Sequence, residues 1–205
     1  DDRGWVQSGS TVLGNTRLSI IDVEGGHQPI GNEDKSIQAV MNGEIYNFME
    51  ICDLLRSRGH VFKTHCDTEV IVHAWEEWGE ACVERLHGMF AFALWDQRDE
   101  ALFLARDRLG IKPLYYTLDA DRFRFASNSQ ALLAGGGVDT ALRFGLRDPL
   151  HPVCAGFELE TGVDVASTDA ANHLFVAPEF SRALADGFRL PAQQLRVAQV
   201  HAQQV

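Results

Sequence analysis

Three polar features in the first part of the chain could hold one small molecule between them. Asn42 and Gly43 follow an apolar run at residues 37–41, and a side-chain amide next to backbone N–H groups can stabilise an oxyanion. Arg17 carries a guanidinium, which can hold a carboxylate through two parallel hydrogen bonds. Asp67 carries a carboxylate, which can accept several hydrogen bonds from an ammonium group.

Each of these residues also has an ordinary structural interpretation. Asn-Gly is a common turn dipeptide, so Asn42 and Gly43 could simply end a strand. A lone arginine such as Arg17 is commonly a surface residue. Asp67 precedes an expected helix and could be its N-cap, a role that is compatible with ligand binding. Taken singly, none of the three identifies a site.

Histidines and cysteines between residues 60 and 73 raise the question of a zinc site. The residues are His60, His65, Cys66 and His73. Their spacing matches no usual zinc ligand pattern, and His73 lies in an expected helix without a histidine partner at i+4. We therefore expect no metal site in this chain.

The four cysteines lack CxxC spacing and are expected to be reduced thiols. Cys52 and Cys82 fall on apolar helix faces, which is typical of core thiols. Cys66 lies near polar groups, but nothing in the sequence identifies it as a nucleophile. We expect a cytoplasmic protein on these grounds.

Composition narrows the class of protein and its partners. The chain has 205 residues, of which 45% are hydrophobic and 23% charged, as in soluble globular proteins. A formal net charge of -11 argues against a nucleic-acid partner. No apolar run approaches the roughly 18 residues of a membrane span, so we expect no membrane partner.

The residues singled out above lie at the ends of expected strands and helices. A strand at 37–41 precedes a helix whose apolar face is Phe48, Ile51, Cys52 and Leu55, at helical spacing. Asn47 with Glu50 gives a capping-box pattern at its start, and Gly59 stands where a C′ glycine belongs. Asp67 or Thr68 is expected to cap the next helix, which Gly79 ends. The other expected elements are strands at 5–6, 11–13, 61–63, 89–95, 101–105, 114–117 and 122–126, a short helix at 80–86, and a last helical turn capped by Ser127.

Two groups of strands separated by two helices predict an α+β protein with sheets packed face to face and helices outside. After Gly137 the pattern weakens. Residues 138–205 contain no Lys, Trp or Tyr and show little periodicity apart from a possible helix at 179–186. We leave this segment unassigned, as a linker, a disordered tail or the product of a shifted reading frame.

Six blocks of residues, in order, resemble one known family. They are residues 17–22, 26–29, 42–47, 67–70, 88–96 and 105–116. Together they closely resemble the glutaminase domain of glutamine-hydrolysing asparagine synthetases, which are class II (N-terminal-nucleophile) glutamine amidotransferases. Residues 68–85 are similar to the subgroup associated with exosortase and exopolysaccharide clusters. The resemblance covers residues 1–134.

The resemblance implies a fold and a set of roles. The family fold is an αββα sandwich of two antiparallel sheets, of the Ntn-hydrolase type. Arg17 matches the residue that binds the α-carboxylate of glutamine, and Glu44 and Asp67 match the acids that hold its α-amino end. Asn42 and Gly43 match the oxyanion hole. Glutamine has one carboxylate, one ammonium group and one carbonyl, so these roles agree with the chemistry of the side chains.

The resemblance also implies parts that this chain lacks. In the family an N-terminal cysteine attacks the glutamine amide, whereas this chain starts at Asp1. We therefore expect a glutamine amidotransferase domain at residues 1–137 that is truncated and incomplete at its N-terminus, and inactive as it stands. No Ser-Gly-Gly-x-Asp-Ser motif for ATP use occurs. ATP and Mg are expected in a separate C-terminal synthetase domain.

In the full protein, the resemblance implies that ammonia from glutamine amidates a carboxylate, by default converting aspartate to asparagine. The synthetase domain is the expected partner, and a homodimer is a further expectation. An alternative is a non-catalytic module that binds glutamine, or another partner, on the same fold. That alternative is motivated by Asp1 and by the unrelated segment at 138–205.

Overall fold

The central element of the fold is a five-stranded sheet. The structure is a computed structural model that describes residues 2–17, 22, 25–118, 123–135 and 195–199. In spatial order the strands of the sheet are β3 (Ile30–Gly31), β4 (Ile37–Ile45), β5 (Gly88–Asp96), β6 (Ala101–Arg106) and β9 (Leu195–Gln199). Neighbours are antiparallel except β6 and β9, which are parallel.

The two long strands of this sheet are buried on both faces. In β5, Phe90, Phe92 and Leu94 belong to one core, and Ala91, Ala93 and Trp95 belong to a second. Successive side chains of a strand point to opposite faces, so the two cores lie on opposite sides of the sheet. A strand that is apolar on both faces requires a covering layer on each side.

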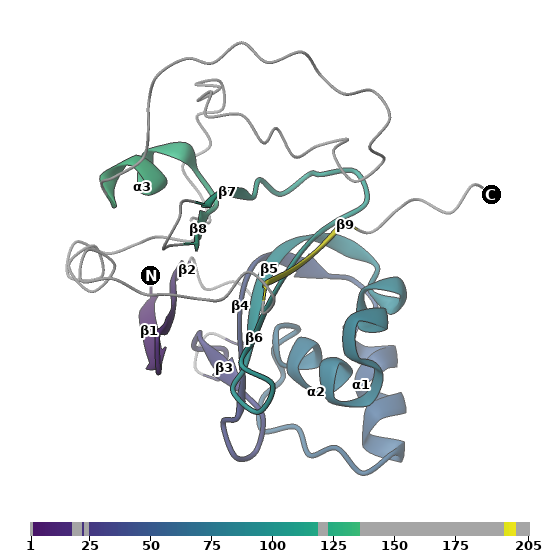
Figure 1. Ribbon diagram of the computed structural model, residues 1–205. Helices are drawn as coiled ribbons and strands as arrows, with labels where there is room; N and C mark the ends of the chain where they lie inside the picture. Colours follow the sequence, from purple (N-terminus) through teal and green to yellow (C-terminus); the bar gives the residue numbers. More distant parts are fainter. Residues whose placement is uncertain (1, 18–21, 23–24, 119–122, 136–194, 200–205) are drawn as a thin grey trace.

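Two helices form the covering layer on one side (Figure 1). α1 spans Phe48–Ser57 and α2 spans Glu69–Trp78, followed by the 3-10 helix η1 at Gly79–Arg85. Their apolar stripes, including Leu55 and Val70, pack against the sheet in the larger core. The predicted helices and the C′ position of Gly59 are confirmed, with φ +102° at that glycine.

The predicted capping box at the start of α1 is wrong. Asn47 is at the N-cap position but makes no side-chain cap bond. Its Nδ2 donates to the carbonyl oxygen of Arg85 (2.9 Å), and its Oδ1 accepts from the N–H of His87 (2.9 Å). The side chain therefore joins the start of α1 to the segment between η1 and β5.

The predicted strand at residues 61–63 is also wrong, because side chains take the backbone hydrogens there. The N–H of Val61 donates to a carboxylate oxygen of Glu33 (3.2 Å). The N–H of Lys63 donates to Oε1 of Glu69 (2.8 Å). With these donors bonded to side chains, residues 61–63 do not pair with a strand.

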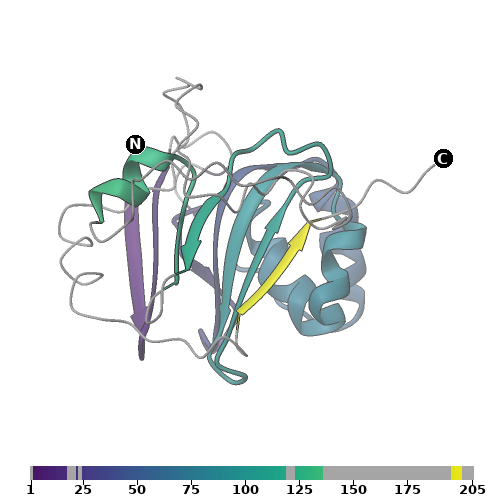
Figure 2. The ribbon, with the colours of Figure 1, turned by 45° about the horizontal axis from the view of Figure 1, so that its top comes forward.

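Two β-hairpins form the layer on the opposite side of the sheet (Figure 2). They are β1 (Asp2–Ser8) with β2 (Thr11–Arg17), and β7 (Tyr115–Leu118) with β8 (Phe123–Ala126). Leu13 of β2 and Leu114 enter the second core with Val40 of β4. Helices and antiparallel strands thus occur together, which confirms the α+β class.

A short helix, α3 (Ser129–Ala134), lies against the second hairpin. Ala131 and Leu132 pack with Ala126 and Tyr115. Its cap is Asn128 and not Ser127 as predicted, because Oδ1 of Asn128 accepts from the N–H of Ala131 (2.7 Å). The order of layers is therefore two helices, central sheet, two hairpins and α3.

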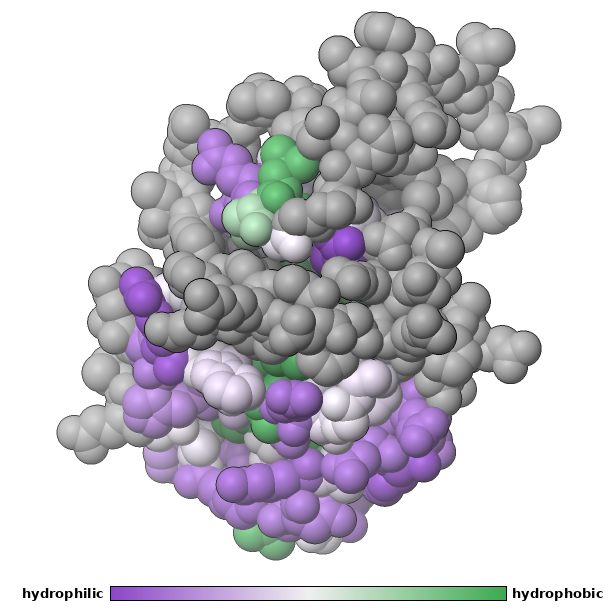
Figure 3. All heavy atoms as spheres, turned by 60° about the vertical axis from the view of Figure 1, so that its left-hand side comes forward, coloured by the Kyte–Doolittle hydropathy of each residue, from purple (hydrophilic) through white to green (hydrophobic). Residues whose placement is uncertain are grey.

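The part of the segment after residue 137 that the structure describes forms a strand, β9, which the sequence pattern did not indicate. β9 pairs in parallel with β6, from Leu102 opposite Leu195 to Arg106 opposite Gln199. The predicted helix at 179–186 lies outside the described residues. No described helix is long and apolar enough to cross a membrane. Seen from the side of β1 and α3, the described surface is mainly hydrophilic (Figure 3).

Candidate functional site

The Asn-Gly dipeptide suggested a turn, but Asn42 and Gly43 lie inside β4. They pair opposite Ala91 and Phe90 of β5, and the chain turns only at residues 46–47. Gly43 has φ +134°, and a Cβ there would lie 2.0 Å from the carbonyl oxygen of Met89. Only glycine fits this position, because a side chain would collide with the backbone of β5.

The edge of β4 that faces away from β5 is partly covered by side chains. The N–H of Met41 donates to Oε1 of Gln28 (2.8 Å), and the N–H of Ile45 donates to Oδ2 of Asp67 (2.9 Å). Alternate residues of a strand direct their N–H groups to the same edge. The N–H of Gly43 therefore faces this edge, between the two that are bonded.

The hydrogen bonds of β5 also indicate that the Gly43 N–H points away from β5. Its neighbour Phe90 donates its N–H to Oδ2 of Asp107 (3.3 Å) and accepts from the N–H of Asp107 (2.7 Å). The backbone of Phe90 is thus bonded on the β6 side. Gly43 and Phe90 are then a pair without mutual hydrogen bonds, which leaves the Gly43 N–H for the open edge.

The side chain of Asn42 points to the hairpin side of the sheet, as Val40 does two residues before it. The residue is 5% exposed, and its Oδ1 has no hydrogen-bond partner among the described residues. A buried polar atom without a partner typically costs about 1–3 kcal/mol. Such atoms call for an explanation, and a binding partner that supplies the missing bond is one.

Asp67 lies two residues before α2 and does not cap it. Thr68 is the N-cap residue, without a side-chain cap bond, and the Asp67 carboxylate is bonded to β4 through Ile45 as described above. Burial raises the pKa of Asp67, the Ile45 N–H lowers it, and the charge of Glu44 raises it, with a net increase. Glu44 is therefore within electrostatic reach of Asp67, as a two-acid site requires.

Arg17 is the last residue of β2, and its guanidinium lies against Gly26. A Cβ on Gly26 would lie 2.7 Å from Nη2 of Arg17. The charge of Arg17 acts on the carboxylate of Asp22 and on the thiol of Cys66, the residue before Asp67. The structure thus brings Arg17 towards the same end of α2 as Asp67.

Asp22 was not singled out in the sequence, although it stands in the first of the six blocks. Its Oδ2 accepts from the N–H of His65 (2.9 Å) and its Oδ1 from the N–H of Gly25 (2.8 Å). These bonds, and to a smaller degree the Arg17 charge, lower the pKa of Asp22. The Asp22 carboxylate thus lies within electrostatic reach of the Arg17 guanidinium.

Gln28 is a second residue that sequence reasoning passed over. It is buried, and its Oε1 accepts from Nδ2 of Asn15 (2.7 Å) as well as from Met41. Its Nε2 donates to Oγ1 of Thr68 (3.1 Å). One amide thus joins β2, β4 and the start of α2, the three elements that carry Arg17, Asn42 and Asp67. Only its place in a matching block could have indicated this.

The described cysteines are not placed as nucleophiles. Burial raises the pKa of Cys52 to about 11 and that of Cys82 to about 12. Burial also raises the pKa of Cys66, which is 2% exposed and whose thiol lies 3.5 Å from Oδ1 of Asp67. A nucleophile must be an accessible thiolate, and these three are buried thiols.

Comparison with known proteins gives one family for most of the chain. Residues 1–148 match the family described as a glutamine amidotransferase domain. Asparagine synthetase [glutamine-hydrolyzing] 3 of Bacillus subtilis (strain 168) is 46% identical over 125 residues, which cover 60% of this chain and 20% of that protein. Asparagine synthetase [glutamine-hydrolyzing] 3 of Arabidopsis thaliana is 48% identical over 122 residues, covering 58% and 21%. The chain spans about a fifth of the length of these relatives.

Similarity to solved structures is weaker. Glutamine phosphoribosylpyrophosphate amidotransferase from B. subtilis, complexed with ADP and GMP, matches with a TM-score of 0.43 and 23% identity. The match covers 50% of this chain and 25% of that one.

Proposed function

The chain belongs to the glutamine amidotransferase domain family, of the asparagine synthetase type, and on this premise we propose that it binds glutamine at the open edge of β4. The bound glutamine would place its side-chain amide against Gly43 and Asn42. Its α-carboxylate would lie towards Arg17, and its α-ammonium group would lie towards Asp67 and Glu44. In this proposal the domain is the glutaminase part of an asparagine-synthetase-like amidotransferase.

The observation that carries the proposal is the pattern of N–H groups along β4. Gln28 and Asp67 bond the N–H groups of Met41 and Ile45, and the N–H of Gly43 lies between them on the same edge. The Asn42 amide adds a second polar group beside it. Attack on an amide carbonyl produces an oxyanion, and each donor to it typically contributes about 3 kcal/mol to lowering the barrier.

The charges around this edge suit an α-amino acid. A guanidinium holds a carboxylate through paired hydrogen bonds, and the position of Arg17 beside Asp22 supports that role. Asp67 and Glu44 interact electrostatically, and an ammonium group between two acids would relieve their repulsion. Asp67 also bonds to Ile45, so the strand that carries Gly43 and the acid for the ammonium group are held together.

For the whole protein we propose that ammonia from glutamine passes to a synthetase domain that activates a carboxylate with ATP and Mg. The names of the relatives support this, with aspartate as the default acceptor. The layers of helices, sheet, hairpins and α3 support an αββα sandwich of the Ntn-hydrolase type. In that arrangement, the elements around β4 supply binding and oxyanion stabilisation.

A non-catalytic glutamine-binding module is the second candidate. The burial of the three described thiols favours it. Ammonia release from glutamine can be measured on the purified chain as a test for catalysis. Release above the rate in buffer excludes a purely binding role.

The proposed site can be tested by calorimetric titration with L-glutamine. We expect Arg17→Ala to weaken binding by about 1.5–3 kcal/mol, the usual contribution of hydrogen bonds to a charged group. Arg56→Ala removes the same charge from the exposed surface of α1 and should bind glutamine like the parent. If circular dichroism shows that Arg17→Ala is folded and its affinity equals that of the parent, Arg17 does not hold the ligand.

A further inference from the structure

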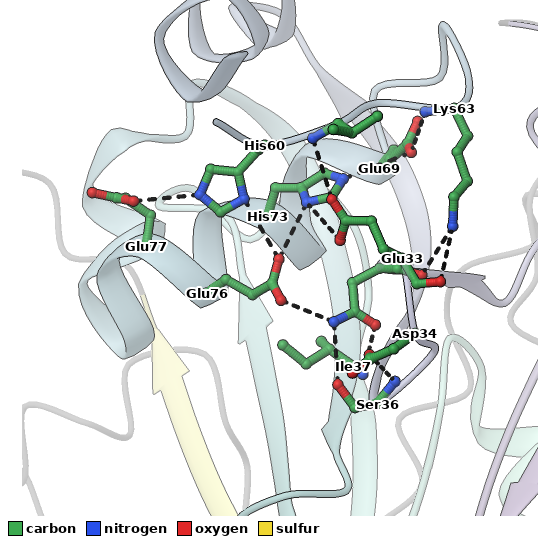
Figure 4. A network of polar contacts seen from close by, with 12 residues as sticks. Glu33, Asp34, Ser36, Ile37, His60, Lys63, Glu69, His73, Glu76 and Glu77 are labelled. Carbon is green, nitrogen blue, oxygen red and sulfur yellow. Dashed lines mark hydrogen bonds and ion pairs between the residues drawn. The ribbon is translucent and has the colours of Figure 1, made fainter. Parts of the chain in front are cut away.

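Two histidines and a glutamate converge beside α2, outside the proposed glutamine site (Figure 4). His73 and Glu76 lie on α2 at i and i+3, which places them on one face of the helix. His60 follows α1 and packs against them, with its ring centroid 5.3 Å from that of His73. Each of the three residues offers one ligand atom, and these atoms all lie within 4.8 Å of one another.

We propose that His60, His73 and Glu76 bind one zinc ion. Oε2 of Glu76 lies 3.2 Å from Nδ1 of His73 and 3.5 Å from Nδ1 of His60. In a tetrahedral zinc site with metal–ligand bonds of about 2.0–2.1 Å, neighbouring ligand atoms are about 3.3 Å apart. Two of the three separations among these ligand atoms therefore already have the length of an edge of such a tetrahedron, and the third is at most 4.8 Å.

The outer nitrogens of both histidines support this choice of ligand atoms. Nε2 of His60 lies 3.3 Å from Oε2 of Glu77, and Nε2 of His73 lies 3.7 Å from Oε1 of Glu69. A histidine that binds a metal commonly donates its other ring N–H to a carboxylate, which orients the ring. His60 thus directs Nδ1 inward and Nε2 to an acid, whereas Nε2 of His73 lies near Glu69 without a hydrogen-bond partner among the described residues.

Glu33 provides a fourth ligand. Its Oε2 lies 4.0 Å from Nδ1 of His73, and its side chain is partly exposed, so it can move towards the metal. Glu33 lies in the loop before β4, whereas His60 lies between α1 and α2. A zinc ion here would tie this loop and this connection to α2, as structural zinc sites do with segments distant in the sequence.

The charge of the cluster also favours a cation. The acids around the two histidines are Glu33, Glu69, Glu76 and Glu77. The cations nearby are engaged at the rim: Arg58 pairs with Glu77, Nζ of Lys63 donates to the carbonyl oxygens of Asn32 and Glu33, and Nη1 of Arg98 lies 3.9 Å from Glu76. Imidazole nitrogen with carboxylate oxygen suits zinc better than magnesium or calcium.

This inference differs from the expectation drawn from sequence spacing. That expectation considered His60, His65, Cys66 and His73, and found no usual ligand pattern. Tertiary structure pairs His60 and His73 with a glutamate, and it places Cys66 against Asp67 and Thr68. The ligand set comes together through the packing of the α1–α2 connection on α2.

The proposal can be tested with the purified chain, stripped of metal with a chelator and titrated with zinc chloride against a chromophoric chelator. We expect one zinc ion per chain, and a thermal midpoint that rises with zinc concentration because the metal binds the folded state. Cobalt chloride should give the intense visible bands of a four-coordinate ion.

Two ligand variants and a matched control decide the outcome. Loss of an outer-shell partner alone typically lowers metal affinity about 10–100-fold, so His60→Gln should lower it at least as much. Glu76→Gln should do the same while keeping an oxygen for the Nδ2 of Asn32, which now donates to Oε1 (2.9 Å). His87→Gln, at an exposed position, should bind zinc like the parent.

Either of two results would overturn the proposal. One is a folded parent chain that binds less than one zinc ion under these conditions. The other is a His60→Gln variant that binds zinc as tightly as the parent does. In either case Glu76 only accepts hydrogen bonds from the two imidazoles.

Discussion

Gly43 is the residue on which the geometry of the proposed oxyanion site depends most directly. Its φ of +134° lies in a region that L side chains rarely adopt, and the strand β5 leaves no space for a Cβ. Both constraints follow from pairing Gly43 opposite Phe90 in the middle of the sheet. Gly43 therefore shapes the proposed oxyanion site and also allows β4 to pair with β5.

At this scale we predict that Gly43→Ala destabilises the protein by at least about 2 kcal/mol, because backbone strain adds to overpacking. The measurement is urea unfolding followed by circular dichroism. Gly59→Ala is the control, since Gly59 also has positive φ, +102°, but nothing lies within 4 Å of a Cβ there. It should cost about 1 kcal/mol. Equal losses in the two variants would contradict the packing argument.

At the scale of elements, polar side chains join helices to the sheet at positions where the sequence suggested capping. Asn47 bonds to the segment before β5, and Asp67 bonds to β4. Asp96, at the end of β5, joins α2 to the sheet, because its Oδ2 accepts from Nε1 of Trp75 (2.9 Å). Arg98 adds three hydrogen bonds to this carboxylate, one from its backbone N–H and two from its guanidinium.

The Asp96 carboxylate makes stability depend on pH. Burial raises its pKa, but the hydrogen bonds from Arg98 and Trp75 outweigh burial, and the net pKa lies below the ordinary value of 3.8. A carboxyl group whose pKa is lower in the folded state stabilises the fold above its unfolded pKa. That contribution disappears as the pH falls through the folded pKa.

We therefore predict that Asp96→Asn lowers stability at pH 7 by about 1.5–3 kcal/mol, the usual contribution of hydrogen bonds to a charged group. The difference from the parent should shrink as the pH falls below about 4. Urea unfolding at a series of pH values measures this. Asp53→Asn, at an exposed position of α1, should show a small difference at every pH. A pH-independent loss in Asp96→Asn would show that its charge is not involved.

At the scale of the whole molecule, the central sheet separates two cores and needs a cover on each face. Helices cover one face and hairpins the other, so the β4 edge with Gly43 lies where β2, β4 and the start of α2 meet. Gln28 holds these three elements together. The proposed glutamine site is thus a product of the layer arrangement.

The strand β9 completes this sheet beyond β6, and its removal should have a specific effect. A chain that ends at residue 194 leaves the outer edge of β6 (Ala101–Arg106) unpaired. We predict faster hydrogen exchange at those β6 amides that face β9, measured by mass spectrometry, with little change in β4. A chain that ends at Gln199 keeps β9 and is the control. Unchanged β6 exchange in the shorter chain would show that β9 does not protect this edge.

The sequence alone was sufficient for the elements with strong periodicity. α1, α2 and the hairpin of β5 and β6 follow from spacing of apolar residues, because burial on one helix face or on alternate strand positions imposes that spacing. The predictions from sequence were wrong where the hydrogen bonds of polar side chains determine the local structure. These places are Asn47, residues 61–63 and Asn128. A side chain chooses its hydrogen-bond partner among groups distant in the sequence, and local patterns contain no information on those partners.

The chain by itself therefore determined its family, its α+β class, and the side chains Arg17, Asn42, Glu44 and Asp67 as candidates for one ligand. Tertiary structure decided that Asn42 and Gly43 lie in a strand, with the Gly43 N–H directed to an open edge between two bonded neighbours. It also decided that His60 meets His73 and Glu76. The physical reason is the same in both cases: strand pairing and helix packing bring together groups that the chain separates.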